Sequence, residues 1–449
     1  MELAAGVRRL SLMKTAPCPT QSNHIKSGNL YSDLTSLFVS FRTRRNPAWK
    51  GYIKKNSSST KSELKVNMKS LSNYSSDDEL SSLTSLCPLD GPYWDKLKDL
   101  SPFMSEFALT KSRVVVQIRW LLKLSQISEV HEVPRFSEEV ESYLHNLSEQ
   151  FNMDDALEVK KIEKVTNDDV KAVEYFLKQK CQSNPEISKV LEFFHFACTS
   201  EDINNLAYAL MIKEAINKVI LPVVDKLIAA ISNMAAASAS TPLLCQIPGQ
   251  PASPTTVGKE MAFFAYRLSR ERNELSETEI LGRLAGAVGN YNLHRVACPD
   301  VNWPRIADEL VTSLGIRFNP DVTQNCQSSS LSRSNYLEVK FDRDIRGYIS
   351  SGHFKQITKV GEIGSSMMPL KVNSIHFKSS EGDCGVANGI LMYLSKMLPI
   401  SFWQRDLIDS TVTRNIGAGL AHSLMAYKRA LQGIAELQVD EASMIADLD

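Results

Sequence analysis

The chain has 449 residues, of which 43% are hydrophobic and 23% charged, so it can bury a large core and form two or three domains. Its 51 Lys and Arg residues balance 51 Asp and Glu residues, and no base-reading motif accompanies them, so we expect no nucleic-acid partner. The longest apolar stretch, around 219–224, is interrupted by Asp225 and Lys226, so we expect no membrane partner either.

Residues 1–70 differ in composition from the rest of the chain. They hold 13 Lys and Arg residues against 3 Asp and Glu residues, together with 11 serines. This basic, Ser-rich and acid-poor composition is typical of an organellar transit peptide, whereas a nucleic-acid-binding arm would cluster its basic residues. We therefore expect residues 1–75 to be a disordered transit peptide that directs the chain to the chloroplast (the plastid stroma), with the mitochondrion as the alternative.

The remainder of the chain is patterned as helix. Apolar residues recur at steps of three and four from 203 to 236, which predicts one long helix that Pro222 bends without ending. Further long helices are predicted at 256–281 and at about 410–438. Alternating strand patterns are scarce, and connections such as 246–251 are short and contain Gly and Pro. The expected fold class is therefore all-α, a bundle of long helices.

Neither a metal nor a cofactor is expected. The eight cysteines are widely spaced, with no C-x-x-C pair and no His cluster at ligand spacing, so they should be reduced thiols rather than zinc ligands. Gly282, Gly286 and Gly289 lack the spacing and the preceding strand of a dinucleotide-binding loop, so close approach of helices explains them better.

Residues 364–373 read G-S-S-M-M-P-L-K-V-N and carry the strongest chemical signal. Two hydroxyls, a glycine and one ammonium suit a loop that removes a proton beside a carboxylate. A serine can act as a base only in a water-poor site, where a nearby cation such as Lys371 lowers the cost of its oxyanion. The segment resembles the G-S-S-x-M-P-x-K-x-N loop of the fumarase/aspartase superfamily of lyases.

Several further segments narrow this resemblance to one family. They are T-N-D-D-V-K-A-V-E-Y (166–175), F-A-C-T-S-E-D-I-N-N (196–205), G-Q-P-A-S-P (249–254), W-Q-R-D (403–406) and S-T-V-T-R-N (410–415). From about residue 80 onward the chain is similar to adenylosuccinate lyase, which splits succinyl-AMP, and the succinyl-amino-imidazole-carboxamide nucleotide SAICAR, into fumarate and a nucleotide. The resemblance implies a C–N lyase of AMP and IMP biosynthesis, acting on these small-molecule substrates.

The resemblance also implies a domain order. A smaller N-terminal helical domain is expected at 76–188, followed by the central helical bundle at 189–438 with a catalytic loop at 361–376. Residues 439–449 would be the start of a C-terminal domain that is otherwise missing.

By resemblance, Ser365 is the base that takes a proton from the succinyl carbon. Thr199 and Ser200 would hold one succinyl carboxylate near a helix N-terminus, and Lys371 and Asn373 would hold the other, whose charge grows as the carbanion forms. Arg405, Ser410 and Arg414 suit the phosphate end. The remaining substrate-binding positions implied are Tyr93, Asn167, Asp169, Gln250, Gln324 and Thr411.

The chain departs from its family at the general acid. The usual T-H-G-Q loop carries a histidine that protonates the leaving nitrogen, but this chain has Pro248 at that position, and proline cannot donate a proton. The carboxylate that orients the histidine falls on Lys378. A second histidine, in the family's N-H-D triplet, has become Asp168, which would repel an anionic substrate if ionised.

Other departures lie nearby. Pro92 replaces the arginine of an Arg-Tyr pair, and the segment 325–340 is Ser-rich and shorter than in the family. Of the eight histidines none falls on a motif position: His195 is expected to pack in a core, and the isolated His353, His376 and His422 offer no obvious substitute for the acid.

An adenylosuccinate lyase of impaired activity is the first hypothesis. The alternative is a non-catalytic paralogue that binds nucleotide or assembles with the intact enzyme, and a fumarase or argininosuccinate lyase is disfavoured by the T-S-E-D-I-N-N and W-Q-R-D segments. The resemblance implies a homotetramer, or a mixed oligomer with an intact paralogue. In such an oligomer the Thr199, Gln250 and Ser365 regions would meet from different chains.

Overall fold

The computed structural model describes residues 85–247, 250–320, 329–357, 375–398 and 409–448, which all lie in the compact unit Tyr74–Asp449. Its helices are α3 (Trp94–Leu97), α4 (Ser101–Met104), α5 (Glu106–Leu124), α6 (Glu138–Glu149), α7 (Met153–Thr166), α8 (Asp169–Cys181), η3 (Ile187–Lys189), η4 (Leu191–His195), α9 (Ser200–Ala215), η5 (Ile216–Ile220), α10 (Leu221–Ala237), α11 (Val257–Glu277), α12 (Asn292–Ala297), α13 (Trp303–Ser313), α14 (Ser329–Ser350), α15 (Ile375–Met397), α16 (Asp409–Thr413), α17 (Ile416–Ala435) and α18 (Glu441–Ala446). Its strands are β1 (Pro242–Ile247), β2 (Gln250–Thr256), β3 (Leu281–Gly282), β4 (Arg317–Phe318), β5 (Phe354–Gln356) and β6 (Leu437–Val439). In the described part of the chain the strands form two-stranded pairs, β1–β2, β3–β4 and β5–β6, so the all-α fold class is confirmed.

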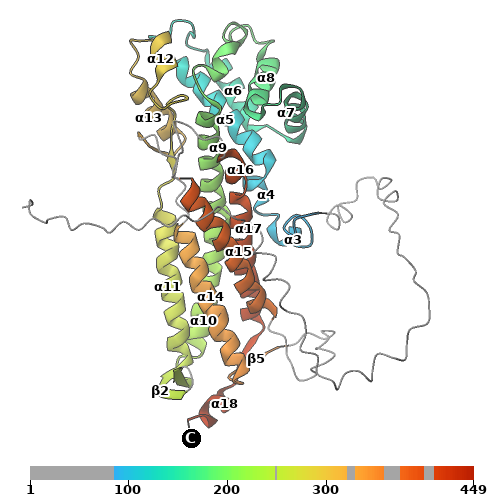
Figure 1. Ribbon diagram of the computed structural model, residues 1–449, viewed down its shortest axis with the longest axis vertical. Coiled ribbons are helices and arrows are strands. Elements are labelled where there is room, and N and C mark those ends of the chain that lie inside the picture. Colours follow the sequence, from blue (N-terminus) through green and yellow to red (C-terminus); the bar gives the residue numbers. More distant parts are fainter. Residues whose placement is uncertain (1–84, 248–249, 321–328, 358–374, 399–408, 449) are drawn as a thin grey trace, which may run out of the picture. The chain divides into compact units, whose positions relative to one another are not determined.

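The long helices pack against one another in a bundle (Figure 1). α10 contacts α11 and α17, α14 contacts α11 and α15, and α15 contacts α17. The helices predicted at 203–236, 256–281 and about 410–438 are therefore neighbours, as their apolar stripes require. The last of these ranges holds two helices, α16 and α17.

The helix predicted at 203–236 runs from Ser200 to Ala237 and contains a π-helical turn, η5, between α9 and α10. Pro222 lies directly after this turn, at the start of α10. Because proline lacks an N–H and crowds the carbonyl four residues earlier, the preceding turn widens. By length and composition this helix could cross a membrane, and its apolar residues contribute to both of the cores described next.

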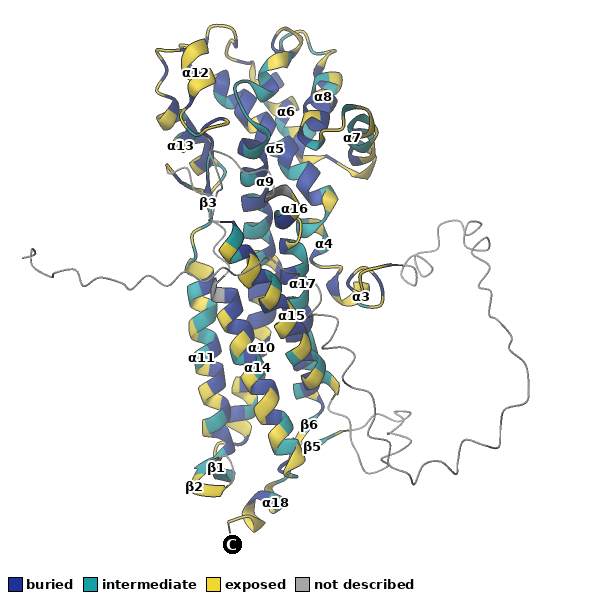
Figure 2. Cartoon of the chain, viewed as in Figure 1, coloured by how far each residue is buried: buried dark blue, intermediate teal, exposed yellow. Residues whose placement is uncertain are grey.

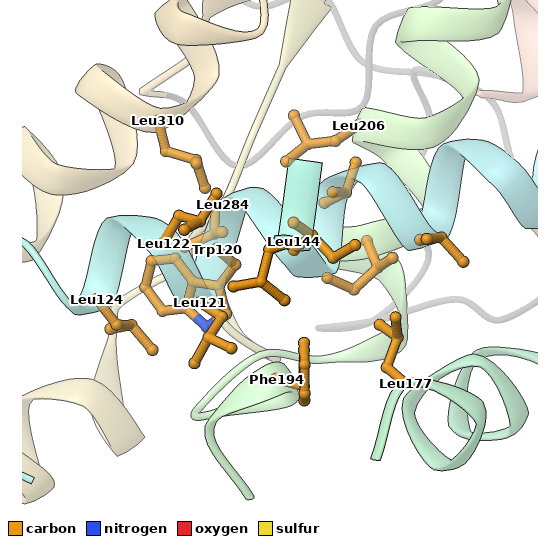
Figure 3. Packing of buried hydrophobic residues seen from close by; sticks show 14 of the residues in the cluster. Trp120, Leu121, Leu122, Leu124, Leu144, Leu177, Phe194, Leu206, Leu284 and Leu310 are labelled. Atoms are coloured by element: carbon orange, nitrogen blue, oxygen red, sulfur yellow. The ribbon is translucent and has the colours of Figure 1, made fainter. Parts of the chain in front are cut away.

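The first core surrounds Trp120 on α5, which is fully buried. Side chains from α6, α8, η4, α9 and α13 close around it (Figure 3), among them Leu144, Leu206 and Leu310. The ring of His294 lies 4.9 Å from that of Trp303 in the same core, and burial lowers its pKa to about 4. His294 is therefore a neutral packing residue at physiological pH.

The second core fills the space between α10, α11, α14, α15 and α17 (Figure 2). Phe341, Phe377 and Tyr427 are fully buried there. The two cores do not follow chain order, because α12 and α13 are separated from α5 and α6 in sequence but contribute to the same core.

In the segment 246–251, expected to be a short connection between helices, residues 246–247 lie instead in strand β1 and residues 250–251 in strand β2, the paired strands of a β-hairpin. β1 and β2 pair antiparallel, with Pro242 opposite Thr256. Prolines break the alternating pattern in these strands, which is why the sequence did not indicate a hairpin. Gly258, just after the hairpin, lets α11 approach the end of α10: a Cβ there would lie 2.5 Å from Ala239 Cα.

Candidate active site

The N-terminus of α9 carries two residues predicted to bind a carboxylate. Thr199 is the N-cap and Ser200 the first helical residue, so both lie at a helix N-terminus, the end of a helix that favours an anion. Asp202 forms a capping box with Thr199 and accepts its backbone N–H at 2.9 Å. The same carboxylate accepts the backbone N–H of Gly286 at 3.1 Å, which fixes the 285–286 loop to this helix end.

Hydrogen bonds between polar and charged side chains join α5, α8, α9 and Arg414, the residue that follows α16. Arg113 donates from Nη2 to Asp169 Oδ2 at 2.7 Å and from Nε to Asn204 Oδ1 at 2.9 Å. Arg414 donates from Nη2 to the same Asp169 oxygen at 3.0 Å. The side chain of Arg113 is 3% exposed and that of Arg414 is 50% exposed. One buried and one open guanidinium therefore share a single carboxylate.

These neighbours set the ionisation of the cluster. Burial alone would raise the pKa of Asp169, but Arg113 and Arg414 hold it below its usual value. Burial alone would lower the pKa of Arg414, but Glu106 and Asp169 raise it. The Asp169 carboxylate is thus anionic and Arg414 is cationic at neutral pH, and the open face of Arg414 can receive an anion.

Asp168, which stands where the resembled motif has a histidine, lies at the start of α8. Asn167 ends α7 in a left-handed conformation, with φ 54°. Asp168 is the N-cap of α8, and its carboxylate accepts the backbone N–H of Lys171 at 2.8 Å. This cap satisfies a backbone N–H that has no partner within the helix, so Asp168 has a structural role at the start of α8.

Tyr93 lies in a different cluster from Asp169 and Arg414. It precedes α3, and the Arg429 guanidinium lies 4.7 Å from the centre of its ring. Arg429 also donates to Asp383 at 2.6 Å, and His422 contacts the other oxygen of Asp383 at 3.1 Å.

Gln250 and Lys378 lie elsewhere again. Gln250 is exposed at the start of β2, in the hairpin at the end of α10 and α11 that is far from α9 (Figure 1). Lys378 is exposed on the first turn of α15. Because α9, η5 and α10 span 38 residues, the hairpin lies ~57 Å from the N-terminus of α9 along this helix. A single chain therefore does not bring Thr199 and Gln250 together.

The histidines that are isolated in sequence have carboxylate partners in the structure. The pairs are His353–Asp447 at 2.7 Å, His376–Glu436 at 3.1 Å and His422–Asp383 at 3.1 Å. His376 is two residues before Lys378, so the two side chains point to opposite sides of α15, and His376 faces the end of α17. Burial lowers the pKa of His195.

Several predicted site residues lie outside the described residues or, for Ser410 in α16, have a side chain that the structure does not describe. They are Pro248, Gln324, Ser365, Lys371, Asn373, Arg405 and Ser410. Thr411 is exposed on α16, one turn before Arg414. In the part of the chain that the structure describes, no group of three or more His, Cys, Asp or Glu side chains could hold a metal ion.

Sequence reasoning missed Arg113. The signal was present, because this arginine falls at helical spacing within the buried stripe of α5, together with Leu109, Val116 and Trp120. A buried arginine needs a partner, and the structure supplies Asp169 and Asn204.

Comparison with known proteins identifies the fold and the family. A family model described as "Lyase" matches residues 93–389, and one described as "Adenylosuccinate lyase C-terminal" matches residues 401–449. Among solved structures, a fumarate lyase from Mesorhizobium sp. BNC1 superposes with a TM-score of 0.64 at 14% identity, covering 79% of this chain and 78% of that one. A 3-carboxy-cis,cis-muconate lactonizing enzyme from Pseudomonas putida gives 0.60 at 18% identity, covering 80% and 78%. The fold and the family model define a lyase of the fumarase/aspartase superfamily.

Relatives found by sequence comparison identify the family within this superfamily. Adenylosuccinate lyase from Haemophilus influenzae (strain ATCC 51907 / DSM 11121 / KW20 / Rd) is 50% identical over 378 residues, and that from Escherichia coli (strain K12) is 49% identical over 382 residues, each match covering 83% of both chains. The chain belongs to the adenylosuccinate lyase family. Sequence of the family's C-terminal region is present from residue 401, so the expectation that this domain is missing is not confirmed.

Proposed function

We propose that this chain catalyses the elimination of fumarate from succinyl-AMP and from SAICAR in purine nucleotide biosynthesis. The observation that carries the proposal is the hydrogen-bonded cluster in which Asp169 holds Arg414. Arg113 links the same Asp169 to Asn204, in the N-terminal half of the helix that Thr199 and Ser200 begin. A half-exposed guanidinium suits a phosphate, and a helix N-terminus suits a carboxylate. The family match does not favour the non-catalytic alternative.

Family resemblance assigns each step of the reaction to a residue. Ser365 takes a proton from the succinyl carbon, and Lys371 and Asn373 stabilise the carbanion through its carboxylate. The electron pair then forms the carbon–carbon double bond of fumarate as the C–N bond breaks. The leaving nitrogen must gain a proton, and Pro248 cannot supply it. Cleavage is therefore slow relative to the family, whereas proton removal is retained.

Proton exchange separates these two steps. We expect the unaltered chain to take up deuterium from heavy water into succinyl-AMP faster than it releases fumarate, and Ser365→Ala to lose the exchange by ~10²-fold or more. Ser366→Ala, which removes the neighbouring hydroxyl, is the matched control and should keep most of the exchange. Equal exchange in the unaltered chain and Ser365→Ala would contradict the assignment of the base.

An oligomer is the second part of the proposal. Thr199 and Gln250 lie at opposite ends of the α9–α10 helix, so a complete site requires other copies of the chain, or intact subunits of a related one. The exposed face of α15 supports such contacts. Gly382, Gly385 and Gly389 have no atom within 4 Å of an added Cβ, and Val386 and Tyr393 are 49% and 53% exposed. This stripe of glycine and apolar residues at helical spacing suits close packing of another helix.

We expect the chain to be a homotetramer and Val386→Arg to dissociate it, because a buried charge without a partner is costly at a helix–helix interface. Light scattering measures the mass. Val165→Arg, the same change at an exposed residue of α7, is the matched control and should leave the mass unaltered. A monomeric unaltered chain would refute the oligomer.

Plastid import is the third part of the proposal, and the composition of residues 1–70 supports it. A fluorescent protein fused to residues 1–75 should enter the chloroplast. Replacing the 13 Lys and Arg residues of this segment by Gln should retain the fusion in the cytosol. Cytosolic retention of the unaltered fusion, or its import into mitochondria, would exclude the chloroplast assignment.

A further inference from the structure

Arg113 is a cation that the proposed chemistry does not use. It lies on the buried face of α5, and its side chain is only 3% exposed. A buried guanidinium is retained only when its N–H groups are satisfied by fixed acceptors. Here the acceptors are Asn204 on α9 and Asp169 at the start of α8.

The two contacts of Arg113 constrain different elements. Nε holds Asn204, one turn after Ser200, and Nη2 holds Asp169 Oδ2. A guanidinium is a planar fork, so holding both acceptors fixes α8 and α9 relative to each other as well as the orientation of the carboxylate. A lysine, which places a single ammonium at the end of a flexible stem, could not hold both acceptors in the same way.

Asp169 transmits this constraint to Arg414. Asp169 Oδ2 accepts a hydrogen bond from Arg414 Nη2 at 3.0 Å. The guanidinium of Arg414 keeps further N–H donors for a ligand, because its side chain is 50% exposed. Without Asp169 held in place, this long side chain would sample several rotamers and lose part of its binding energy to ordering.

We infer that Arg113 is a positioning residue for the phosphate of the nucleotide: it fixes Asp169, and Asp169 holds the Arg414 guanidinium in the orientation that receives the phosphate. The inference rests on the proposed function. It predicts a selective defect, because only ligands that carry the phosphate use Arg414. AMP, the nucleotide that remains after fumarate leaves succinyl-AMP, and adenosine, which lacks the phosphate, are the probes.

The experiment measures AMP and adenosine binding to the full chain by titration calorimetry. Arg113→Met should weaken AMP binding roughly 10-fold to 100-fold and leave adenosine binding unchanged, since a charge-assisted contact is lost only from the phosphate end. Arg113→Met/Arg414→Met should bind AMP no more weakly than Arg414→Met alone, because the two residues act through one contact. Arg119→Met, an exposed arginine on the same helix, is the matched control and should bind both ligands like the unaltered chain.

The outcomes are distinguishable. If the unaltered chain binds neither ligand, the proposed function is wrong and the inference falls with it. Suppose that the unaltered chain binds AMP. If the affinity of Arg113→Met for AMP is then within about twofold of the unaltered chain's, or if its affinities for AMP and adenosine fall equally, Arg113 has only a structural role and the proposed function stands. Should Arg113→Met fail to fold, Arg113→Lys decides by the same criteria, because it keeps the buried charge but not the fork.

Discussion

The Pro248→His/Lys378→Glu double variant is expected to release fumarate from succinyl-AMP about 10²–10⁴ times faster than the unaltered chain, which is the usual contribution of a general acid. The histidine would protonate the leaving nitrogen, and the glutamate would orient the imidazole and stabilise its charged form. Lys378 is exposed on the first turn of α15, so a glutamate there would be accessible to a histidine from another chain of the proposed oligomer. The assay is fumarate release at saturating substrate.

Pro248→Ala/Lys378→Gln is the matched control. It removes the proline ring and the lysine charge but adds neither an acid nor a carboxylate, so its rate should stay close to that of the unaltered chain. An equal gain in this control would show that backbone restriction or lysine charge limits the rate. Turnover of the unaltered chain at ~1–10³ per second would show that another residue already serves as acid.

The free energy of unfolding should fall as the pH rises from about 4.5 to about 8, because of a carboxyl pair in the second core. Glu338 and Asp342 lie one turn apart on α14 and are 1% and 0% exposed. Among the described residues neither contacts a Lys or Arg nitrogen, since the nearby Arg343 and Arg346 pair with Glu381. Burial raises the pKa of Glu338 to about 8, and burial together with the charge of Glu338 raises the pKa of Asp342 well above its usual value.

The direction follows from proton binding. The unfolded chain releases the Glu338 proton near pH 4.5, whereas the folded chain keeps it until about pH 8, so stability is fully present at low pH and is lost through that interval. Glu338→Gln should therefore gain a few kcal/mol over the unaltered chain at pH 8 and little at pH 4. Urea unfolding at both pH values measures the difference.

Glu139→Gln is the control for that experiment, because Glu139 is an exposed carboxyl on α6. It should not change how stability depends on pH. The same pH dependence in Glu338→Gln as in the unaltered chain would mean that the buried pair does not titrate in this range.

Helical periodicity was sufficient to predict the bundle. The stripes at 203–236, 256–281 and 410–438 correspond to α9–α10, α11 and α16–α17, because an apolar stripe that long has to be buried against other helices. The hairpin was not predictable from alternation, since its strands contain Pro242, Pro251 and Pro254.

The candidate site was harder to predict for two physical reasons. Motif resemblance identifies residues one by one, but it does not show that Arg113, distant in sequence, holds Asp169 and through it Arg414. A single chain also leaves Gln250 at the far end of the α9–α10 helix from Thr199, so the fold of one chain does not bring these two predicted positions together.

The π-helical turn η5 changes the direction in which the longest helix presents its apolar side chains. A π turn holds about one residue more than an α turn, so the residues that follow it are rotated by roughly 100° relative to an uninterrupted α-helix. Leu206, before the turn, faces the Trp120 core, and Leu227, after it, faces the bundle core. Ile216–Ile220 thus acts as a one-residue phase shift, which lets one continuous helix bury two differently directed faces.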